Sequence, residues 1–374
     1  CTMFIERAAS LAQRRGAIGM ITMHAWMFLD SYRELRPWML SAMSIDSMAH
    51  LGTRAFDSIG GEVVQTTAFT TTNASCDADR AGVYLRLVDG RSEAEKAQLL
   101  REAAANNDHA VRFETSVAAL AVIPGRPVVY WASQQMLNAF AVGTPLEKIA
   151  EAKVGLQTGD NERFLRQWYE VSADRSYMRA RDREDAKASG ARWFPYNKGG
   201  EFRKWWGNRE YVVNWFGDGR EIRASRERAS VANEDMYFLE GVTWSRVSTG
   251  ELSIRSIESG VISDNVAPVI RTSSIDENAI VSYLNSGPAR VLIDAIAPGT
   301  HFEVGQVKSL PWMTPEFFDP AAVERLIEIF RSDWDARETS WDFARPPYLC
   351  GGHSLLQDAF DDWYRRSCET ADEA

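Results

Sequence analysis

Residues 192–228 carry cations and aromatic side chains in alternation. The cations are Arg192, Lys198, Arg203, Lys204, Arg209, Arg220 and Arg223, and the aromatic residues are Trp193, Phe194, Tyr196, Phe202, Trp205, Trp206, Tyr211, Trp215 and Phe216. Guanidinium and ammonium groups bind phosphates or guanine edges, while aromatic rings position a loop or wedge at a base step. The stretch therefore suits contact with a nucleic acid. An ordinary β-rich domain with a tryptophan core would explain most of the aromatic residues, but only about half of the cations.

Three further features lie within or outside this stretch. Lys198 precedes two glycines, whose backbone N–H groups beside an ammonium favour a phosphate contact. Arg246, next to a tryptophan, and Arg255 are lesser candidates of the same kind. Residues 155–161 (GLQTGDN) form a turn-rich loop that either faces the same partner or acts as a hinge, and a plain turn before a helix explains it equally well.

The net charge of −10 argues against a simple electrostatic coating of nucleic acid. The charge is uneven, however. Residues 171–230 contain 14 Lys and Arg against 9 Asp and Glu, whereas residues 313–374 contain 6 against 14. The sequence therefore predicts a basic middle and an acidic tail, and tail tryptophans such as Trp334 suit docking onto a neighbouring domain.

The four cysteines show no CxxC spacing and the five histidines are scattered, so neither a zinc site nor a disulfide framework is expected. His24 and His301 have no partners at metal spacing and are expected to be structural. The sequence contains no apolar run of roughly 18–20 residues that would suit a membrane helix, and its first residues lack the features of a signal peptide. A reducing cytoplasm is therefore expected, and the chain is expected to begin in the middle of a domain.

The first ninety residues alternate helical and strand patterns. Apolar residues at helical spacing predict a helix near residues 4–12, and a second helix follows Asp30, where Pro37 should kink or shorten it. Short apolar or β-branched runs predict strands at residues 17–23, 47–51, 62–69 and 82–88. This order indicates the second half of a mixed α/β sheet.

The later pattern differs. A polar helix is expected at residues 92–105, and the turn at residues 123–127 is the best candidate for a domain boundary. From Gly155 onward, short strands are separated by Gly, Asn and Asp turns, and a last helix is expected at residues 320–337. The predicted parts are residues 1–113 (α/β), 114–153 (linker), 154–313 (α+β) and 314–374 (helical acidic tail).

Several segments resemble amino-methylating DNA methyltransferases. Residues 4–8, 19–22 and 26–27 are similar to the helix and strand that shape the adenine pocket in that family. Residues 51–56 and 61–69 resemble the motif in which a strand presents an aromatic residue to a flipped-out base. The fold that the resemblance implies is the C-terminal half of a Rossmann-like methyltransferase domain, followed by a target-recognition domain.

Later segments are similar to one subfamily, the PglX-type adenine methyltransferases of phage-exclusion (BREX) systems. The matching segments are residues 123–125, 130–131, 155–161, 164–166, 196–205, 241–245, 284–286, 302–305 and 310–311. The last three segments also recur in the specificity subunits of restriction systems. The resemblance covers nearly the whole chain.

The resemblance assigns candidate roles to residues. Phe69 would stack on the flipped adenine, and Trp26 would line the pocket as an apolar wall. Phe56 is a second aromatic candidate, for which core packing below the pocket is the simpler interpretation. Without the family, a core phenylalanine is the simpler interpretation of Phe69. The DNA-binding residues would be Arg192, Lys198, Arg203, Lys204, Trp205, Arg209 and Arg246. No metal is implied.

The family's glycine-rich turn for S-adenosylmethionine and its Asn/Asp-Pro-Pro-Tyr motif are both absent from the sequence. The expected function is therefore part of a site-specific DNA adenine-N6 methyltransferase in phage defence, inactive as this segment alone. Its expected partners are double-stranded DNA, the remainder of the methyltransferase domain and other defence subunits. A non-catalytic specificity module and a protein-interaction scaffold are the alternatives.

Overall fold

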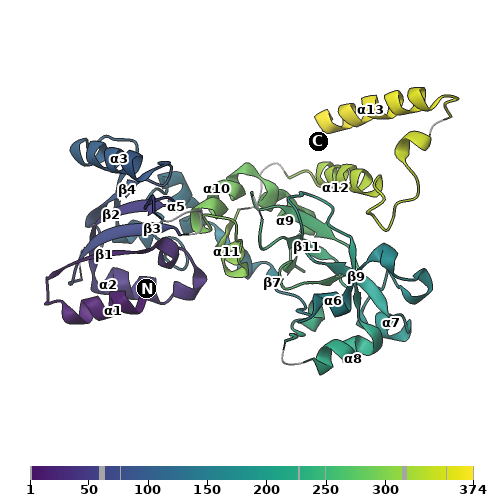
Figure 1. The fold of residues 1–374 in the computed structure, drawn as a ribbon, viewed down its shortest axis with the longest axis horizontal. Coiled ribbons are helices and arrows are strands. Elements are labelled where there is room, and N and C mark those ends of the chain that lie inside the picture. Colours follow the sequence, from purple (N-terminus) through teal and green to yellow (C-terminus); the bar gives the residue numbers. More distant parts are fainter. Residues whose placement is uncertain are drawn as a thin grey trace. The chain divides into compact units, whose positions relative to one another are not determined.

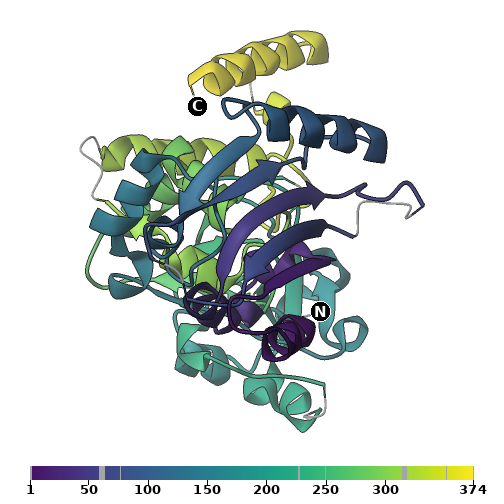
Figure 2. The ribbon, with the colours of Figure 1, turned by 90° about the vertical axis from the view of Figure 1, so that its left-hand side faces the viewer.

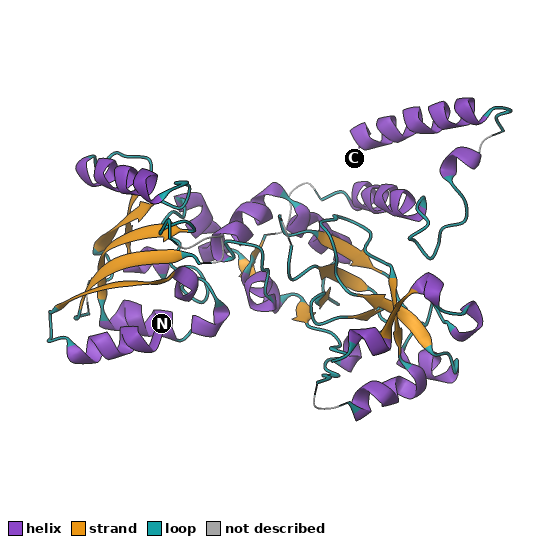
Figure 3. Cartoon of the chain, in the orientation of Figure 1, coloured by secondary structure: helices purple, strands orange, loops and turns teal. Residues whose placement is uncertain are grey.

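The computed structural model describes residues 2–58, 64–75, 77–225, 228–248, 250–313, 318–350 and 352–373. The chain divides into two compact units, Cys1–Gly143 with Asp294–Pro298, and Thr144–Ile293 with Gly299–Ala374. Figure 1 labels the elements, and Figure 3 shows that helices and strands occur in both units. The predicted mixed α/β class is confirmed.

The first unit is built on a five-stranded sheet with the order β1-β3-β2-β4-β5 (Figure 2). Its strands are β1 (Ala17–Met23), β2 (Ser44–Gly52), β3 (Thr66–Thr72), β4 (Ala81–Arg86) and β5 (Arg112–Ser116). β3 runs antiparallel to β1 and to β2, and β2 is parallel to β4, so β1, β2 and β4 point in one direction. The predicted strands coincide with β1, lie within β2 and overlap β3 and β4, although residues 62–63 lie outside the described part of the chain.

One face of this sheet packs against helices. The helices of the unit are α1 (Thr2–Leu11), α2 (Leu35–Ala42), α3 (Glu93–Ala105), α4 (Val117–Leu120) and α5 (Gln134–Val142). Ile18, Met48 and Phe69 point to the buried face and are at most 9% exposed. Pro37 lies in the first turn of α2, where a missing N–H costs no intrahelical hydrogen bond. The helix that begins there is short, with eight residues.

The second unit contains two four-stranded sheets, with the orders β13-β9-β10-β8 and β12-β11-β14-β7, and a two-stranded β15-β6 pair. The strands are β6 (Thr144–Pro145), β7 (Glu151–Lys153), β8 (Leu165–Gln167), β9 (Trp193–Asn197), β10 (Tyr211–Asn214), β11 (Gly241–Trp244), β12 (Ile254–Ile257), β13 (Ile262–Ser263), β14 (Val269–Arg271) and β15 (Pro311–Trp312). The helices are α6 (Asn161–Phe164), α7 (Arg183–Ala188), α8 (Phe216–Ala224), α9 (Glu277–Asn285), α10 (Gly287–Ile296, which ends in the first unit), α11 (Val304–Ser309), α12 (Pro320–Asp335) and α13 (Leu356–Glu373). None of the helices in the described ranges is both long and apolar enough to cross a membrane.

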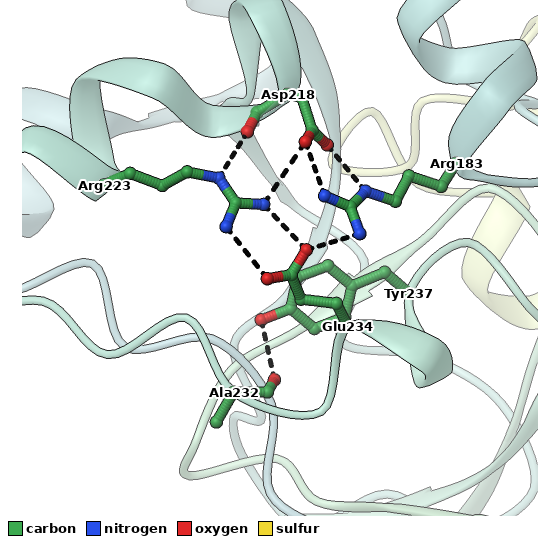
Figure 4. Close-up of polar contacts among 6 residues, drawn as sticks. All are labelled: Arg183, Asp218, Arg223, Ala232, Glu234 and Tyr237. Carbon is green, nitrogen blue, oxygen red and sulfur yellow. Dashed lines mark hydrogen bonds and ion pairs between the residues drawn. The ribbon is translucent and has the colours of Figure 1, made fainter.

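A closed ring of ion pairs fastens α7 to the start of α8 (Figure 4). Asp218 accepts from Arg183 Nε at 2.8 Å and from Arg223 Nη2 at 3.4 Å. Glu234 completes the ring, 2.6 Å from Arg183 Nη1 and 2.7 Å from Arg223 Nη2. Asp218, with φ of 62°, and its two glycine neighbours all have positive φ values. The ring therefore holds a left-handed turn in place. These two arginines are therefore structural cations.

Candidate functional site

The carboxyl ends of β1, β2 and β4 lie at one edge of the first sheet, because the three strands point in the same direction. Open α/β sheets bind ligands at such an edge. His24 directly follows β1, and His50 lies near the end of β2, paired with Arg86 of β4. The loop of residues 53–58 follows β2 at the same edge.

The aromatic candidates of this unit lie in different surroundings. Phe69 sits in the middle of β3, paired with Met20 and Met48, and is 4% exposed. Its ring packs edge-on against Trp26, with centroids 5.4 Å apart. Trp26 is itself buried and donates to Thr22 Oγ1 at 3.0 Å. The ring of Phe69 is therefore a core side chain here and is not displayed at the rim of the sheet.

Phe56 lies in the loop after the carboxyl end of β2 and is 37% exposed. Its strand points to the edge at which His24 follows β1. Of the three predicted pocket residues, Phe56 is therefore the one with an accessible ring.

Three residues that the sequence analysis did not combine form a hydrogen-bonded chain at this edge. His24 Nδ1 lies 2.8 Å from His50 Nε2, and His50 Nδ1 lies 3.0 Å from the Tyr130 hydroxyl. Burial lowers the pKa of His24 to about 4 and that of His50 to about 3, so both rings are neutral at pH 7. The residues are too far apart in sequence for any spacing rule to join them, and a neutral, hydrogen-bonded His24 is consistent with the structural role expected of it.

Much of the predicted DNA-binding stretch of the second unit is covered by α12. Arg203 forms an ion pair with Asp333 at 3.1 Å and stacks 4.9 Å from the ring centre of Trp334. Arg331 lies 4.7 Å from the ring centre of Trp206. Trp334, which was expected to dock onto a neighbouring domain, is 4% exposed and docks within its own unit.

The other residues of that segment are also held inside the protein. Arg209 is 6% exposed, pairs with Glu258, and lies 3.4 Å from the Trp206 ring centre; burial lowers its pKa. Lys204 donates to the carbonyl of Asn285 at 3.3 Å. The backbone of Trp205, with φ of 67°, bonds to β12 on both sides. These residues join β12, α9 and α12 and do not form an open cationic surface.

Arg192 remains on the surface. Its side chain is 43% exposed and lies 3.6 Å from Glu221, a separation at which a solvated pair contributes little. It precedes β9, whereas Lys198 follows β9, so the two cations lie at opposite ends of that strand.

Three parallel segments end at one edge of the second unit. β13 runs parallel to β9, and Leu156 forms a parallel bridge to Asp264 just after β13. Gly155 makes this close approach possible, because a Cβ atom there would lie 1.8 Å from the Ser263 carbonyl oxygen. The next residues on the three segments are therefore brought together at this edge.

Those residues are Lys198, Gln157 and Asn265. The amide of Asn265 Nδ2 lies 3.4 Å from Gln157 Oε1. Lys198 Nζ lies 4.7 Å from the ring centre of Tyr211, and among the described residues it forms no ion pair with a carboxylate. Arg246 joins them by donating to the Asn265 carbonyl at 3.4 Å. We call Gln157, Lys198, Arg246 and Asn265 the polar rim.

A buried polar network anchors the polar rim from below. Tyr196 donates to Asp264 Oδ2 at 2.9 Å, and Asp264 Oδ1 accepts from the Val266 N–H at 3.0 Å. Burial raises the pKa of Asp264 and that of Tyr196. Glu303 holds Arg246 with two contacts of 3.1 Å. The rim is therefore fixed by contacts formed within the unit.

The described residues contain no metal-ligand cluster, and the glycine turn between β4 and α3 is filled. No cluster of three or more His, Cys, Asp or Glu side chains has metal-binding geometry in the described ranges. The turn from β4 to α3 contains Gly90, but Lys96 fills it and donates to the Leu87 carbonyl at 2.6 Å. Ser92 caps the first turn of α3. The turn between β4 and α3 is therefore filled and does not fit S-adenosylmethionine.

The comparisons with known proteins cover almost the whole chain. A family model for the Eco57I restriction-modification methylase matches residues 1–56. The adenine-specific methyltransferase PglX of Lacticaseibacillus casei (strain Zhang) is 36% identical over 98% of this chain and 31% of its own length. The adenine-specific methyltransferase BrxX of Escherichia coli O9:H4 (strain HS) is 38% identical over 92% of this chain and 27% of its own length. The chain thus spans about a third of the length of these curated relatives or less.

Two solved structures share the fold. The type IIL restriction-modification enzyme MmeI, in complex with DNA, aligns with 99% of this chain and 52% of its own chain, with a TM-score of 0.52 at 12% identity. A nuclease-deletion mutant of the type ISP enzyme LlaGI aligns with 89% of this chain and 30% of its own chain, with a TM-score of 0.50 at 11% identity. Over nearly its whole length, this chain is therefore homologous to the PglX and BrxX family of adenine-specific methyltransferases.

Proposed function

We propose that the chain is the part of a site-specific DNA adenine-N6 methyltransferase that closes the target-base pocket and reads the DNA site. The intact enzyme would transfer a methyl group from S-adenosylmethionine to adenine in duplex DNA, in a cytoplasmic phage-defence system with other subunits. The identity to PglX and BrxX supports the class of enzyme. The observation that carries the DNA-reading role is the joining of Gln157, Asn265 and Arg246 by hydrogen bonds at the strand edge where β9 leads into Lys198.

The first unit is proposed to be completed by the remainder of a methyltransferase domain. Among the described strands, β1 pairs only with β3, so its other edge is open. Ile21 on β1 is 63% exposed, and Phe4 on α1 is 68% exposed. A hollow on β1, β3 and β2 is lined by Gly19, Met20, Ile21, Ser47, Ala49, Ala68, Phe69 and Thr70. An open edge beside exposed apolar side chains supports pairing with another strand, and that remainder would bind S-adenosylmethionine.

Within the base pocket, the stacking role is proposed for Phe56 in place of Phe69. A base that leaves the duplex regains about 1–3 kcal/mol by stacking on an aromatic ring. Phe56 has an accessible ring at the carboxyl edge of the sheet, whereas Phe69 is enclosed by Trp26. Trp26 would support the pocket wall from within the core.

For DNA binding, we propose the residues of the polar rim in place of residues 203–209, which the sequence analysis had favoured. Lys198 has an ammonium without a carboxylate partner in the described part of the chain, which suits a phosphate. Arg192 remains a secondary candidate on the surface. Arg203 is instead proposed to hold α12 through Asp333.

The test is the salt dependence of DNA binding by the Lys198→Ala variant of the intact enzyme. Losing one phosphate contact should weaken binding to every duplex and make the slope of log K against log salt shallower by about 1. Lys187→Ala is the matched control. Lys187 lies on α7, which precedes the start of β9, whereas Lys198 follows the end of β9, so Lys187 is not part of the polar rim. An unchanged slope for Lys198→Ala, or an equal change in both variants, would remove the polar rim as the DNA contact.

A further inference from the structure

We propose that Gln157 and Asn265 together read one adenine of the DNA target in the major groove. This inference rests on the proposed function, because it requires that the polar rim faces DNA. It adds a chemical identity to the base that the rim recognises, and it names the two side chains that recognise it.

The two side chains are presented by rigid backbone. The Gln157 N–H donates to the Ser230 carbonyl at 2.9 Å, and its carbonyl accepts from the Ser230 N–H at 2.8 Å. The Asn265 N–H donates to the Leu156 carbonyl at 3.0 Å. Only the side chains of Gln157 and Asn265 are free to adjust, and Gln157 is exposed. Side chains that recognise a base need such a rigid backbone, because a misplaced backbone would reduce sequence specificity.

The hydrogen bond between the two amides leaves a defined pair of unused groups. As assigned, Asn265 Nδ2 donates to Gln157 Oε1, which leaves the Gln157 amino group as a donor and Asn265 Oδ1 as an acceptor. If both amides are turned over, the bond reverses, and Gln157 Oε1 and the Asn265 amino group remain. In either case, the pair keeps one donor and one acceptor. Among the described residues, neither group has another hydrogen-bond partner.

This pair complements adenine better than the other bases. The major-groove edge of adenine offers an acceptor at N7 and a donor at N6. Guanine offers two acceptors there, thymine an acceptor and a methyl group, and cytosine a donor. The amide pair satisfies both polar groups of adenine, and every other base leaves a group unmatched.

The neighbouring cations suit the same approach to DNA. Arg246 donates to the Asn265 carbonyl and is itself held by Glu303, so it positions the Asn265 backbone. Lys198 lies after the adjacent strand, where an ammonium can contact a phosphate without reading sequence. The rim thus combines a base-reading pair with a positioning contact.

The first experiment compares Gln157→Ala and Asn265→Ala in the intact enzyme, with methylated sites mapped by single-molecule sequencing. Each variant should lose roughly 10- to 100-fold of its preference for adenine at one position of the site, other than the methylated base, and retain the other positions. Gln134→Ala is the matched control, because Gln134 and Asn138 form a similar exposed amide pair, 2.9 Å apart, on α5. An unchanged site in both variants would overturn the proposal.

The second experiment keeps the wild-type protein and changes the DNA. Duplexes carrying 7-deazaadenine at the position found above lack the N7 acceptor, so they should bind wild-type enzyme roughly 10-fold more weakly than unmodified duplexes do. The variant that lacks the N7 donor, Gln157→Ala as assigned, should bind both duplexes equally, whereas Asn265→Ala should still distinguish them. Equal binding of both duplexes by wild-type enzyme would overturn the amide pair as a reader. If Lys198→Ala weakens all duplexes while the base preferences persist in the amide variants, the proposed function stands and only this inference fails.

Discussion

Replacing Phe69 with alanine is expected to destabilise the first unit and not simply to remove a contact with DNA. The ring is 4% exposed and packs edge-on against Trp26, with centroids 5.4 Å apart. Truncating a buried phenylalanine costs about 3–5 kcal/mol, because the surrounding core closes the cavity only partly. The aromatic pair supplies about 0.5–1.5 kcal/mol of that loss. We therefore expect the free energy of unfolding of this unit to fall by about 3–5 kcal/mol.

Two comparison variants separate packing from base contact. Phe69→Leu retains most of the buried apolar volume and should cost less than about 1.5 kcal/mol. Phe56 is 37% exposed, so Phe56→Ala should lower the free energy of unfolding clearly less than Phe69→Ala does. Methylation should follow the opposite order, because Phe56 is the proposed stacking residue.

The assay has two parts. Urea unfolding of the chain measures the free energy, and methylation of duplex DNA by the intact enzyme with the same substitution measures activity. A folded Phe69→Leu enzyme should methylate DNA, and a folded Phe56→Ala enzyme should be impaired. If Phe69→Ala unfolds at the same urea concentration as the parent and still abolishes methylation, the core assignment of Phe69 is refuted.

Two further predictions concern pH and charge. His24 and His50 have pKa values lowered to about 4 and about 3, so below pH 6.5 the unfolded chain takes up protons that the folded chain does not. The free energy of unfolding should therefore be highest above pH 6.5. Between pH 6.5 and pH 4, each histidine should lower it by about 1.4 kcal/mol for each pH unit, and equal urea midpoints at pH 7 and pH 5 would contradict this. Asp218→Asn should cost about 1–3 kcal/mol at pH 7, because asparagine tolerates the left-handed turn but cannot pair with Arg183 and Arg223. Those arginines lower the pKa of Asp218, so this cost should disappear as the pH falls below that pKa, and a parent and variant of equal stability at pH 7 would show that the ring contributes nothing.

The secondary structure of the first unit was largely predictable from the sequence. The apolar run at residues 17–23 coincides with β1, and the polar helix at residues 92–105 differs from α3 by one residue. Hydrophobic period and caps are local, so a sequence pattern carries them. The placement of β3 between β1 and β2 is not local, and no pattern in the sequence indicates that order.

The candidate site was less predictable, because the state of a cation depends on distant residues. Arg203 and Lys204 were expected to contact DNA, but Asp333 binds the first and the Asn285 carbonyl accepts from the second. Their contacts come from α12 and α9, far along the chain. Composition shows that a segment is basic, but it cannot show which of its charges are already neutralised by the fold. Lys198, by contrast, has no carboxylate partner among the described residues, so the phosphate contact expected from the two glycines after it stays a prediction.

The residues that sequence reasoning did not join into a site share one physical origin. In both units, polar side chains gather where parallel segments end: His24 and His50 in the first, Gln157 and Asn265 in the second. Each residue follows or ends an apolar run, so its position at a strand end is predictable. Which ends become neighbours depends on strand pairing, and a single residue such as Gly155 decides whether two segments can approach. Because this pairing assembles the polar rim, a variant that alters Gly155 should displace Gln157 and Asn265 together. Without the pairing, neither side chain is expected to recognise a base.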